Sequence, residues 1–222
     1  MLEELISQSH AHGADFIRTV DISMLSEKEN RGYSVAILIG IVLSSDYIFH
    51  LSKENKLDTS EFSETEQRTD ELAEWIADFI VSKGYDALAQ SERRLLAKGF
   101  YDETTKTTPL PHKTIAIFSG LGWIGKDNLL VTKEYGSAIC MCTVLTNAPL
   151  PTDNKPIIMP ACGECTVCKD ICPTGVIHGC TWNRNVHRDS IVDVYNCIGC
   201  LKCLANCPWT QKYMKDNRSK LY

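Results

Sequence analysis

The pattern of apolar and polar residues predicts a helix followed by a strand at the start of the chain. Leu2, Leu5 and Ile6 fall on one face of a short helix, and Gly13 can end it. Residues 14–20 then read as a strand. The chain therefore opens as a protein of mixed α and β structure.

The next two segments predict the core of the first half. Val35–Leu43 is an apolar run rich in β-branched residues, which is typical of a central strand covered on both faces. Ser63 and Glu66 match a helix capping box, and the apolar residues after them repeat at helical spacing until Gly84. We therefore expect a buried strand and a long helix with Ser63 as its N-cap.

Shorter segments complete the pattern. Residues 91–98 predict a short helix, residues 113–119 fit a helix or a strand, and residues 136–147 are rich in strand-forming side chains. Four prolines between positions 149 and 160 indicate a linker. The expected organisation is an α+β fold with an α/β body over residues 1–147, a Pro-rich linker over 148–160, a cysteine-rich module over 161–210 and a polar tail over 211–222.

Composition and charge narrow the classes of protein. A hydrophobic fraction of 44% and a charged fraction of 23% are those of a globular chain. The longest apolar run is far below the roughly 20 residues that cross a bilayer, and the N-terminus lacks the features of a secretory signal. We therefore expect a cytoplasmic protein without a membrane span. A net charge of −5 disfavours nucleic acid as a partner.

The 11 cysteines carry the candidate chemistry. A reducing cytoplasm argues against disulfides, and most of these cysteines form two copies of the spacing C-x2-C-x2-C-x3-C-P. In this ferredoxin-type spacing the fourth cysteine of each copy binds the other cluster. The sequence therefore predicts two 4Fe-4S clusters, the first held by Cys162, Cys165, Cys168 and Cys207, and the second by Cys172, Cys197, Cys200 and Cys203.

Several alternatives to this ligand set stay open. Structural zinc is the main one, although zinc sites usually pair separate C-x2-C units and need neither a third cysteine nor Cys-Pro. Cys180 could replace one cysteine of the second motif, and His178 and His187 could ligate a cluster, but we expect eight cysteines to suffice. Cys140 and Cys142 share one face of a predicted strand, where buried thiols are more common than redox groups.

A glycine-rich stretch precedes the cysteines. It matches the dinucleotide-binding pattern G-x-G-x-x-G, but the residues after it read as a turn entering a strand and not as the helix that such a site requires. One interpretation is a tight loop that packs a tryptophan against the core. The other is a cradle whose amides and lysine face an anionic cofactor group. The candidate cofactor-binding residues are Gly120, Gly122, Trp123, Gly125 and Lys126.

Three stretches carry a family resemblance: GLGWIGKDNLL from Gly120, YGSAICMCTVLTNAPLP from Tyr135 and CGECTVCKDICPTG from Cys162. Through them the chain resembles the epoxyqueuosine reductase family, which is related in architecture to reductive dehalogenases. The resemblance implies a nitroreductase-like α/β domain that binds cobalamin, with flavin as the lesser alternative. It also implies a ferredoxin-like module with two 4Fe-4S clusters, which accepts electrons from a donor such as reduced ferredoxin or flavodoxin.

The chain departs from this family in two places. The family has an aspartate acting as acid at the start of a D-T-A-P-like stretch, and this chain has Lys106-Thr107-Thr108-Pro109 there. The family also carries a C-terminal extension that helps to hold tRNA, whereas this sequence ends 15 residues after Cys207. We therefore expect a short relative that acts on another, unidentified small molecule and not on tRNA.

Two functions compete on these grounds. The first is an oxidoreductase in which the clusters pass electrons to cobalamin or flavin in the α/β domain. The second is an electron-transfer protein whose α/β domain docks a partner. A two-cluster ferredoxin needs little more than the cysteine-rich module, so the long additional body favours the oxidoreductase.

Overall fold

The structure is a computed structural model, and it describes residues 1–53 and 57–218. It contains a four-stranded sheet in the order β1-β2-β6-β3 and a two-stranded hairpin, β4-β5, together with helices. This confirms the mixed α and β fold predicted from the sequence. No helix of the described residues is long and apolar enough to cross a membrane.

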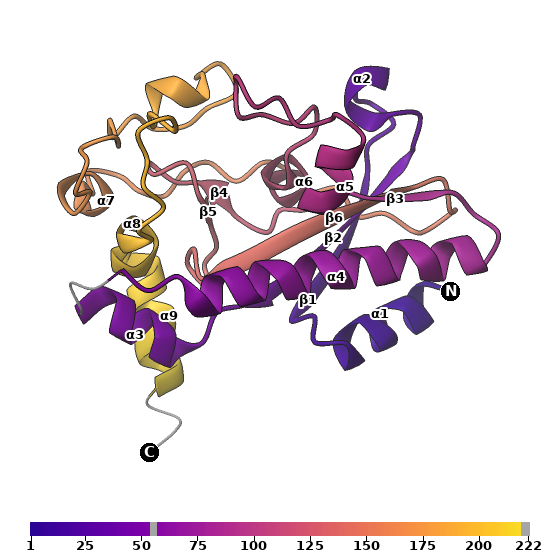
Figure 1. The fold of residues 1–222 in the computed structure, drawn as a ribbon, viewed down its shortest axis with the longest axis horizontal. Helices are drawn as coiled ribbons and strands as arrows, with labels where there is room; N and C mark the ends of the chain where they lie inside the picture. The colour runs from indigo at the N-terminus through magenta and orange to yellow at the C-terminus, as the bar shows by residue number, and fades with distance from the viewer. Residues whose placement is uncertain (54–56, 219–222) are drawn as a thin grey trace. The chain divides into compact units, whose positions relative to one another are not determined.

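The elements follow each other along the chain as shown in Figure 1. Their bounds are α1 Leu2–Ala11, β1 Phe16–Asp21, α2 Glu27–Asn30, β2 Val35–Val42, α3 Ser45–Lys53, α4 Ser60–Ser82, β3 Ala87–Ala89, α5 Glu92–Ala97, α6 His112–Phe118, β4 Trp123–Ile124, β5 Leu130–Val131, β6 Ile139–Thr146, α7 Val167–Asp170, the 3-10 helix η1 Arg188–Ser190, α8 Lys202–Asn206 and α9 Pro208–Arg218.

The chain divides into two compact units, each assembled from separate stretches of sequence. The boundaries expected from the sequence, at residue 147 between body and linker and at residue 161 between linker and cysteine-rich module, stay a prediction. The first unit contains Met1–Ile41, Glu64–Gly120 and Cys140–Pro156, and the second contains Val42–Ser63, Leu121–Ile139 and the chain from Ile157 onward.

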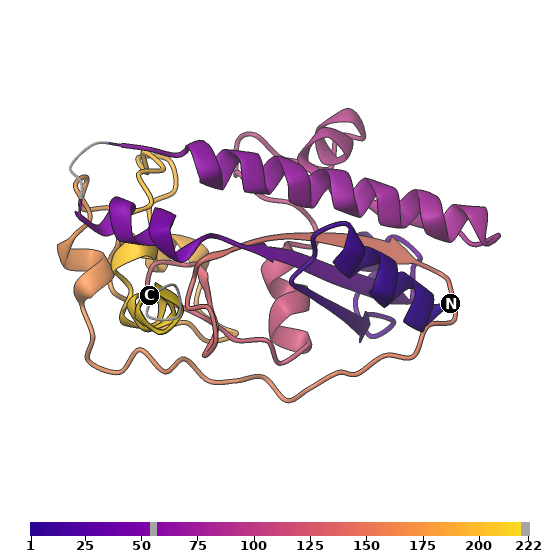
Figure 2. The same ribbon diagram turned by 90° about the horizontal axis from the view of Figure 1, so that it is seen from below.

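The core of the first unit is built on strand β2. Its residues from Val35 to Ile41 are all buried, as the unbroken apolar run predicts. Strand β2 pairs with β1 in antiparallel register, with Val20 opposite Ala36. Helices α1 and α4 cover one face through side chains such as Leu5 and Ile76. Figure 2 shows α4 along one side of the sheet and the shorter α6 on the other side.

Helix α4 begins earlier than the capping-box pattern predicts. Its first residue is Ser60, and the carboxylate of Asp58 accepts hydrogen bonds from the Ser60 N–H (3.0 Å) and hydroxyl (2.7 Å). Asp58 therefore supplies the oxygen acceptor at the helix start that was expected from Ser63. The predicted start was wrong because a better oxygen acceptor lies upstream, and Glu66 falls within the helix.

Two other segments are settled by tertiary packing. The ambiguous segment 113–119 is mostly helical, because α6 places Ile115 and Ala116 in the interior. The expected polar tail stays a prediction, and its residues up to 218 complete helix α9. That helix buries Thr210 and Met214. The rest of the expected tail lies outside the described residues.

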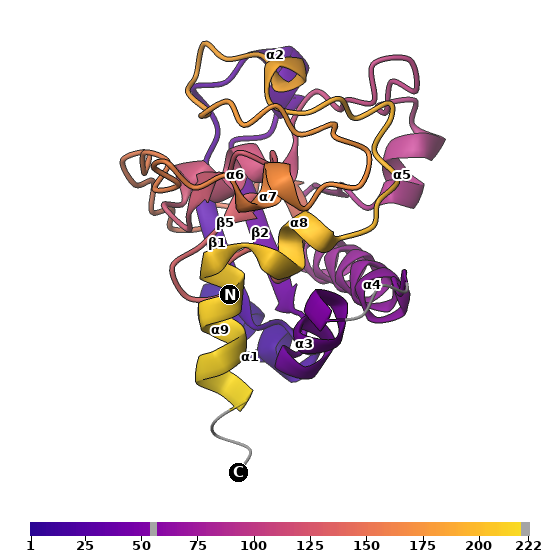
Figure 3. The same cartoon turned by 90° about the vertical axis from the view of Figure 1, so that its left-hand side faces the viewer.

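The second unit is held together by its helices and by a close backbone contact. Helix α3 packs against α8 and α9, and α7 packs against α8 (Figure 3). Gly136 has a φ of 59°, and a Cβ added there would overlap the backbone of Thr210. The N–H of Ser137 donates to the Thr210 hydroxyl at 2.9 Å. The segment before β6 can therefore lie against the first turn of α9 only because position 136 has no side chain.

We predict that Gly136→Ala destabilises the protein by about 1–3 kcal/mol, because the new methyl group overlaps the Thr210 backbone and the left-handed φ is unfavourable for alanine. Gly84→Ala is the matched control, since Gly84 has a φ of 87° and nothing within 4 Å of an added Cβ. The free energy of unfolding should be measured by urea denaturation without oxygen. Equal losses in the two variants would show that the Thr210 contact adds nothing.

Candidate functional site

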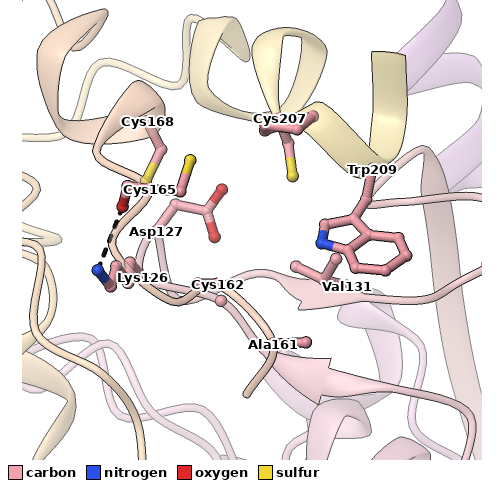
Figure 4. A pocket seen from close by; sticks show the side chains of 11 residues that line it. Lys126, Asp127, Val131, Ala161, Cys162, Cys165, Cys168, Cys207 and Trp209 are labelled. Carbon is pink, nitrogen blue, oxygen red and sulfur yellow. Dashed lines mark hydrogen bonds between the residues drawn. The ribbon is translucent and has the colours of Figure 1, made fainter. Parts of the chain in front are cut away.

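Four cysteines line one pocket of the second unit. The pocket has a volume of about 310 Å3, and the cysteines are Cys162, Cys165, Cys168 and Cys207. Figure 4 shows Cys165, Cys168 and Cys207 with their sulfur atoms toward the pocket. These are the four residues that the crossed motif assigns to one cluster. Their contact with iron stays a prediction, but the structure brings this set together.

The local backbone explains how distant cysteines meet. The Cys165 N–H donates to the Cys162 carbonyl at 3.0 Å, which closes the turn between the first two cysteines. Cys168 lies in the short helix α7. Cys207 precedes Pro208, the first residue of α9, where a proline removes no helical hydrogen bond. The Cys-Pro pair thus ends one helix and starts another at the pocket.

Lys126 ties the cysteine turn to the hairpin. Its Nζ donates to the carbonyl oxygens of Gly163 (2.7 Å) and Cys165 (3.2 Å), and Figure 4 shows the second bond. Both acceptors belong to the turn that carries the first two cysteines. The ammonium group therefore orders the cysteine turn. A contact between Lys126 and a cofactor other than the cluster stays a prediction.

The glycines of the predicted loop allow close packing within the hairpin. A Cβ at Gly122 would overlap the carbonyl of Val131, and a Cβ at Gly125 would lie 2.7 Å from an Asp127 carboxylate oxygen. Trp123 lies between them and is fully buried. The loop leads into β4 and β5 and not into a helix, so it lacks the context of a dinucleotide site. This geometry favours the packing interpretation.

Gly120, the first glycine of the loop, belongs to the first unit. It has a φ of 68°, and an added Cβ would lie 2.6 Å from the Cβ of Lys155. The N–H of Lys155 donates to the Phe118 carbonyl at 2.8 Å. Gly120 therefore lets the end of α6 approach the segment at Lys155. A role of Gly120 in cofactor binding stays a prediction.

Two tryptophans form an apolar wall next to the cysteines. The rings of Trp123 and Trp209 meet edge to face with centroids 5.1 Å apart. Trp123 packs with Val131 and Cys207, with Cys162 beside them. The indole Nε1 of Trp123 is buried and has no hydrogen-bond partner among the described residues. An acceptor is therefore expected near this wall.

Asp127 is a site residue that sequence reasoning missed. It is buried, and Figure 4 shows its carboxylate among the cysteine side chains of the pocket. Its Oδ1 accepts the Leu129 N–H at 3.1 Å. Burial, followed by the charge of Asp127, raises the pKa of Cys168 to about 12. A single aspartate in a turn gives no sequence signal, because most such residues are solvated.

The second set of cysteines is also gathered within this unit. Cys172 and Cys203 pack against one apolar group made of Val176, Ile177 and Val192. Burial, the charge of Asp127 and the thiols at positions 197 and 200 all raise the pKa of Cys203. The four predicted ligands of the second cluster are therefore linked by packing and by charge. Their ligand role stays a prediction.

The distances among these side chains do not match a single-ion site. Among the described residues, no three His, Cys, Asp or Glu side chains are arranged to surround one metal ion. In a 4Fe-4S cluster each of four thiolates binds a different iron, so its ligands need not converge on one point. The four-cysteine pocket remains the geometric basis for a cluster.

The remaining cysteines and histidines take other positions. Cys140 and Cys142 are buried, as expected. Cys180 is half-buried, and its thiol donates to the Thr181 carbonyl at 3.7 Å. His187 is exposed and caps the 3-10 helix η1.

The first unit contains an acidic pocket that sequence reasoning also missed. Its volume is about 410 Å3, and Glu66, Asp70 and Glu92 line it together with His112. Burial, followed by the charges of Glu92 and Asp70, raises the pKa of Glu66 to about 7. Desolvation lowers the pKa of His112 to about 4, so its ring is neutral near pH 7. The i, i+4 spacing of Glu66 and Asp70 on one helix was the available sequence signal.

One lining residue of this pocket belongs to the stretch that departs from the reductase family. Thr108 lies in the Lys106–Pro109 segment, and it lines the acidic pocket. Lys106 itself has a φ of 50°. The pocket therefore includes one residue of this stretch, and it contains carboxylates from helices α4 and α5.

Comparison with curated proteins identifies sequences that are similar to this chain. No protein-family model matches the chain. Epoxyqueuosine reductase from Atelocyanobacterium thalassa is 30% identical over 156 residues, which is 60% of this chain and 50% of that protein. The chain is similar to the epoxyqueuosine reductases. The enzyme from Aliivibrio fischeri is 24% identical over 62% of this chain and 43% of its own length. The matches thus span about half the length of these reductases.

Solved structures show the same fold. An epoxyqueuosine reductase with an epoxyqueuosine-modified tRNA-Tyr stem loop gives a TM-score of 0.60 at 18% identity, over 95% of this chain and 65% of that chain. A catabolic reductive dehalogenase gives a TM-score of 0.74 at 18% identity, over 96% of this chain and 33% of that chain. The predicted resemblance to both kinds of protein is confirmed. The first structure contains RNA, so the expectation that this chain does not bind nucleic acid stays a prediction.

The acidic pocket predicts a pH-dependent stability. A folded Glu66 keeps its proton up to about pH 7, whereas an unfolded glutamate loses it near 4.5. The free energy of unfolding contributed by Glu66 therefore falls as the pH rises through this window. We expect the free energy of unfolding of Glu66→Gln, relative to the wild type, to increase by up to about 1 kcal/mol when the pH is raised from about 5 to about 8. The gain is limited to this size because solvent screens the charges at the mouth of the pocket.

Urea unfolding at both pH values checks this expectation. Glu64→Gln is the matched control, since Glu64 lies on the same helix and does not line the acidic pocket. Its difference from the wild type should stay constant with pH. A constant difference for Glu66→Gln as well would contradict the proposed crowding of carboxylates.

Proposed function

We propose that this chain is an iron-sulfur oxidoreductase. Two 4Fe-4S clusters pass low-potential electrons to a cobalamin, or alternatively to a flavin, in a nitroreductase-like α/β part, and an unidentified small molecule is reduced. The observation that carries the proposal is the pocket that brings Cys207 of the second motif to Cys162, Cys165 and Cys168 of the first. This is the exchange of ligands expected for a ferredoxin-like pair of clusters.

The residues around the pocket fit a cluster. Four thiols supply the ligand number of a 4Fe-4S site, and a 4Fe-4S site needs only thiolates from the protein. The buried Nε1 of Trp123 lacks a partner among the described residues, and cluster sulfur atoms are acceptors. The wall of Trp123 and Trp209 keeps water from one side of the thiols. Lys126 holds the turn on which Cys165 is placed.

The relatives support the finer parts of this proposal. The curated relatives are named epoxyqueuosine reductases, and one structural neighbour with a TM-score of 0.74 is described with B12-dependent dehalogenation. By analogy with these relatives, the α/β part would hold the cobalamin or flavin, and reduced ferredoxin or flavodoxin would supply the electrons. Lys106 stands where the family has its acid, so we propose a small-molecule substrate and not tRNA, in the cytoplasm.

A purely electron-transferring protein is the second candidate. The four-cysteine pocket would serve it equally well, because that pocket needs no residue from the first unit. The discriminating measurement is the absorption spectrum of protein purified without oxygen, followed by acid release and mass analysis of any bound small molecule. Cobalamin or flavin in stoichiometric amount supports the oxidoreductase, and its absence from protein with full cluster content supports the electron carrier.

The crossed ligand sets predict which cysteine changes act alike. Wild-type protein purified without oxygen should contain about eight iron and about eight sulfide per chain. Cys168→Ala and Cys207→Ala should remove the same cluster signal, while Cys172→Ala should remove the other, as followed by EPR of the reduced protein. Zinc without sulfide would refute the clusters. Loss of the same signal in the Cys168 and Cys172 variants would refute the crossing.

Asp127 predicts a charge effect on the first cluster. Reduction adds an electron, and a buried carboxylate beside the ligands makes this less favourable. Asp127→Asn keeps an oxygen acceptor for the Leu129 N–H and removes the charge. We expect its midpoint potential to rise by on the order of 59 mV, which corresponds to a tenfold change in the ratio of reduced to oxidised cluster.

An EPR-monitored redox titration measures this shift without any substrate. Asp170→Asn is the control, because Asp170 is an exposed residue of α7 that accepts a hydrogen bond from Thr166. Its cluster potential should remain at the wild-type value. An unchanged or lowered potential in Asp127→Asn would show that Asp127 does not act through its charge.

A further inference from the structure

A cavity in the first unit is lined by cations. Its volume is about 430 Å3, and Arg31, Arg94 and Lys98 are among its lining residues, with Asp78 as an acid on the same wall. Much of the remaining wall is apolar and comes from α4 and from β3, which spans Ala87–Ala89. The cavity thus joins a positive region to an apolar surface, although the chain as a whole has a net charge of −5.

Arg31 is held in place by its neighbours. It has a left-handed φ of 55° at the end of α2, and its guanidinium lies over the ring of Phe100 at 4.3 Å. Its Nη1 donates to the Oε1 of Gln90 at 2.6 Å. Gln90 is fully buried, and its backbone N–H donates to the Thr143 carbonyl at 2.8 Å. The guanidinium is therefore fixed before any ligand arrives.

Two donors of the Arg31 guanidinium lack acceptors. The Nε and Nη2 of Arg31, which lines the cavity, are buried and have no hydrogen-bond partner among the described residues. An unpaired buried donor destabilises the folded protein, and arginine cannot relieve this cost by losing its proton. Burial also lowers the pKa of Arg31, so its charge is held in unfavourable surroundings. An acceptor with negative charge would offset both effects.

We propose that this cavity binds a small oxyanion, a phosphate or carboxylate group carried on an apolar or aromatic body. The guanidinium of Arg31 presents a planar set of donors that matches two oxygens of such a group. Arg94 and Lys98 add positive charge on the exposed side. Alanines and the rings of Tyr33 and Phe100 offer contact to the body of the ligand. The inference is independent of the proposed clusters.

Isothermal titration of the full chain with phenyl phosphate tests the site. Benzoate is the carboxylate arm, and phenol is the neutral ligand of similar shape. Phenyl phosphate or benzoate should bind at least about tenfold more tightly than phenol, which corresponds to about 1.4 kcal/mol. Tighter binding of phenyl phosphate than of benzoate assigns a phosphate ligand, and the reverse order assigns a carboxylate. Equal affinity for both anions and for phenol overturns the proposal.

Two neighbouring arginines on helix α5 provide a matched pair of variants. Arg94 lines the cavity, whereas Arg93 is 72% exposed and pairs with Glu74. Arg94→Gln should weaken the tighter-binding anion at least fivefold, and Arg93→Gln should leave its affinity within twofold of the wild type. Equal effects of the two changes overturn the proposal, since general surface charge would then explain the binding.

Arg31→Lys tests the fork of donors separately from the charge. It should weaken the tighter-binding anion by at least about tenfold while phenol binding is unchanged. Circular dichroism of the variant establishes that it is folded. If it does not fold, the Arg94 and Arg93 comparison still decides the outcome, because both side chains are exposed. Wild-type anion affinity in folded Arg31→Lys overturns the assignment of Arg31.

Discussion

The close contact between Gly136 and Thr210 is the constraint on which the cysteine site depends. It lets the segment before β6 lie directly on the first turn of α9, and the Ser137 N–H donates to the hydroxyl of Thr210. Cys207 stands immediately before that turn. The position of the contact therefore fixes where Cys207 meets the first cysteine motif, which lies far from it in the sequence. The pocket is a result of helix packing as much as of cysteine spacing.

Charge is distributed unevenly around the thiols. The ammonium of Lys126 donates to two backbone carbonyls of the cysteine turn. Asp127, the next residue, places a carboxylate in the pocket. Burial and this carboxylate raise the pKa values of neighbouring thiols, including Cys207 to about 11. Iron would have to offset these effects by binding thiolates, so cluster assembly and folding are expected to be coupled.

The elements that the sequence predicted well are those whose pattern is local. The buried run at Val35 gave the central strand, and the apolar helical spacing after Ser63 gave most of α4. The start of α4 was wrong because Asp58 supplies the N-terminal acceptor. Residues 211–218 continue helix α9, which buries Met214. The packing that buries Met214 is not visible in a window of neighbouring residues.

The sequence by itself determined the spacing of the eight cysteines and, through that spacing, which four should share a pocket. It also determined the resemblance to the epoxyqueuosine reductases. Only the tertiary structure decided that Lys126 orders the cysteine turn, that Asp127 lies among the thiols, and that Glu66 and Arg31 line separate cavities. The physical reason is that ligand spacing is carried by adjacent residues, whereas burial and charge depend on neighbours that folding brings from distant parts of the chain.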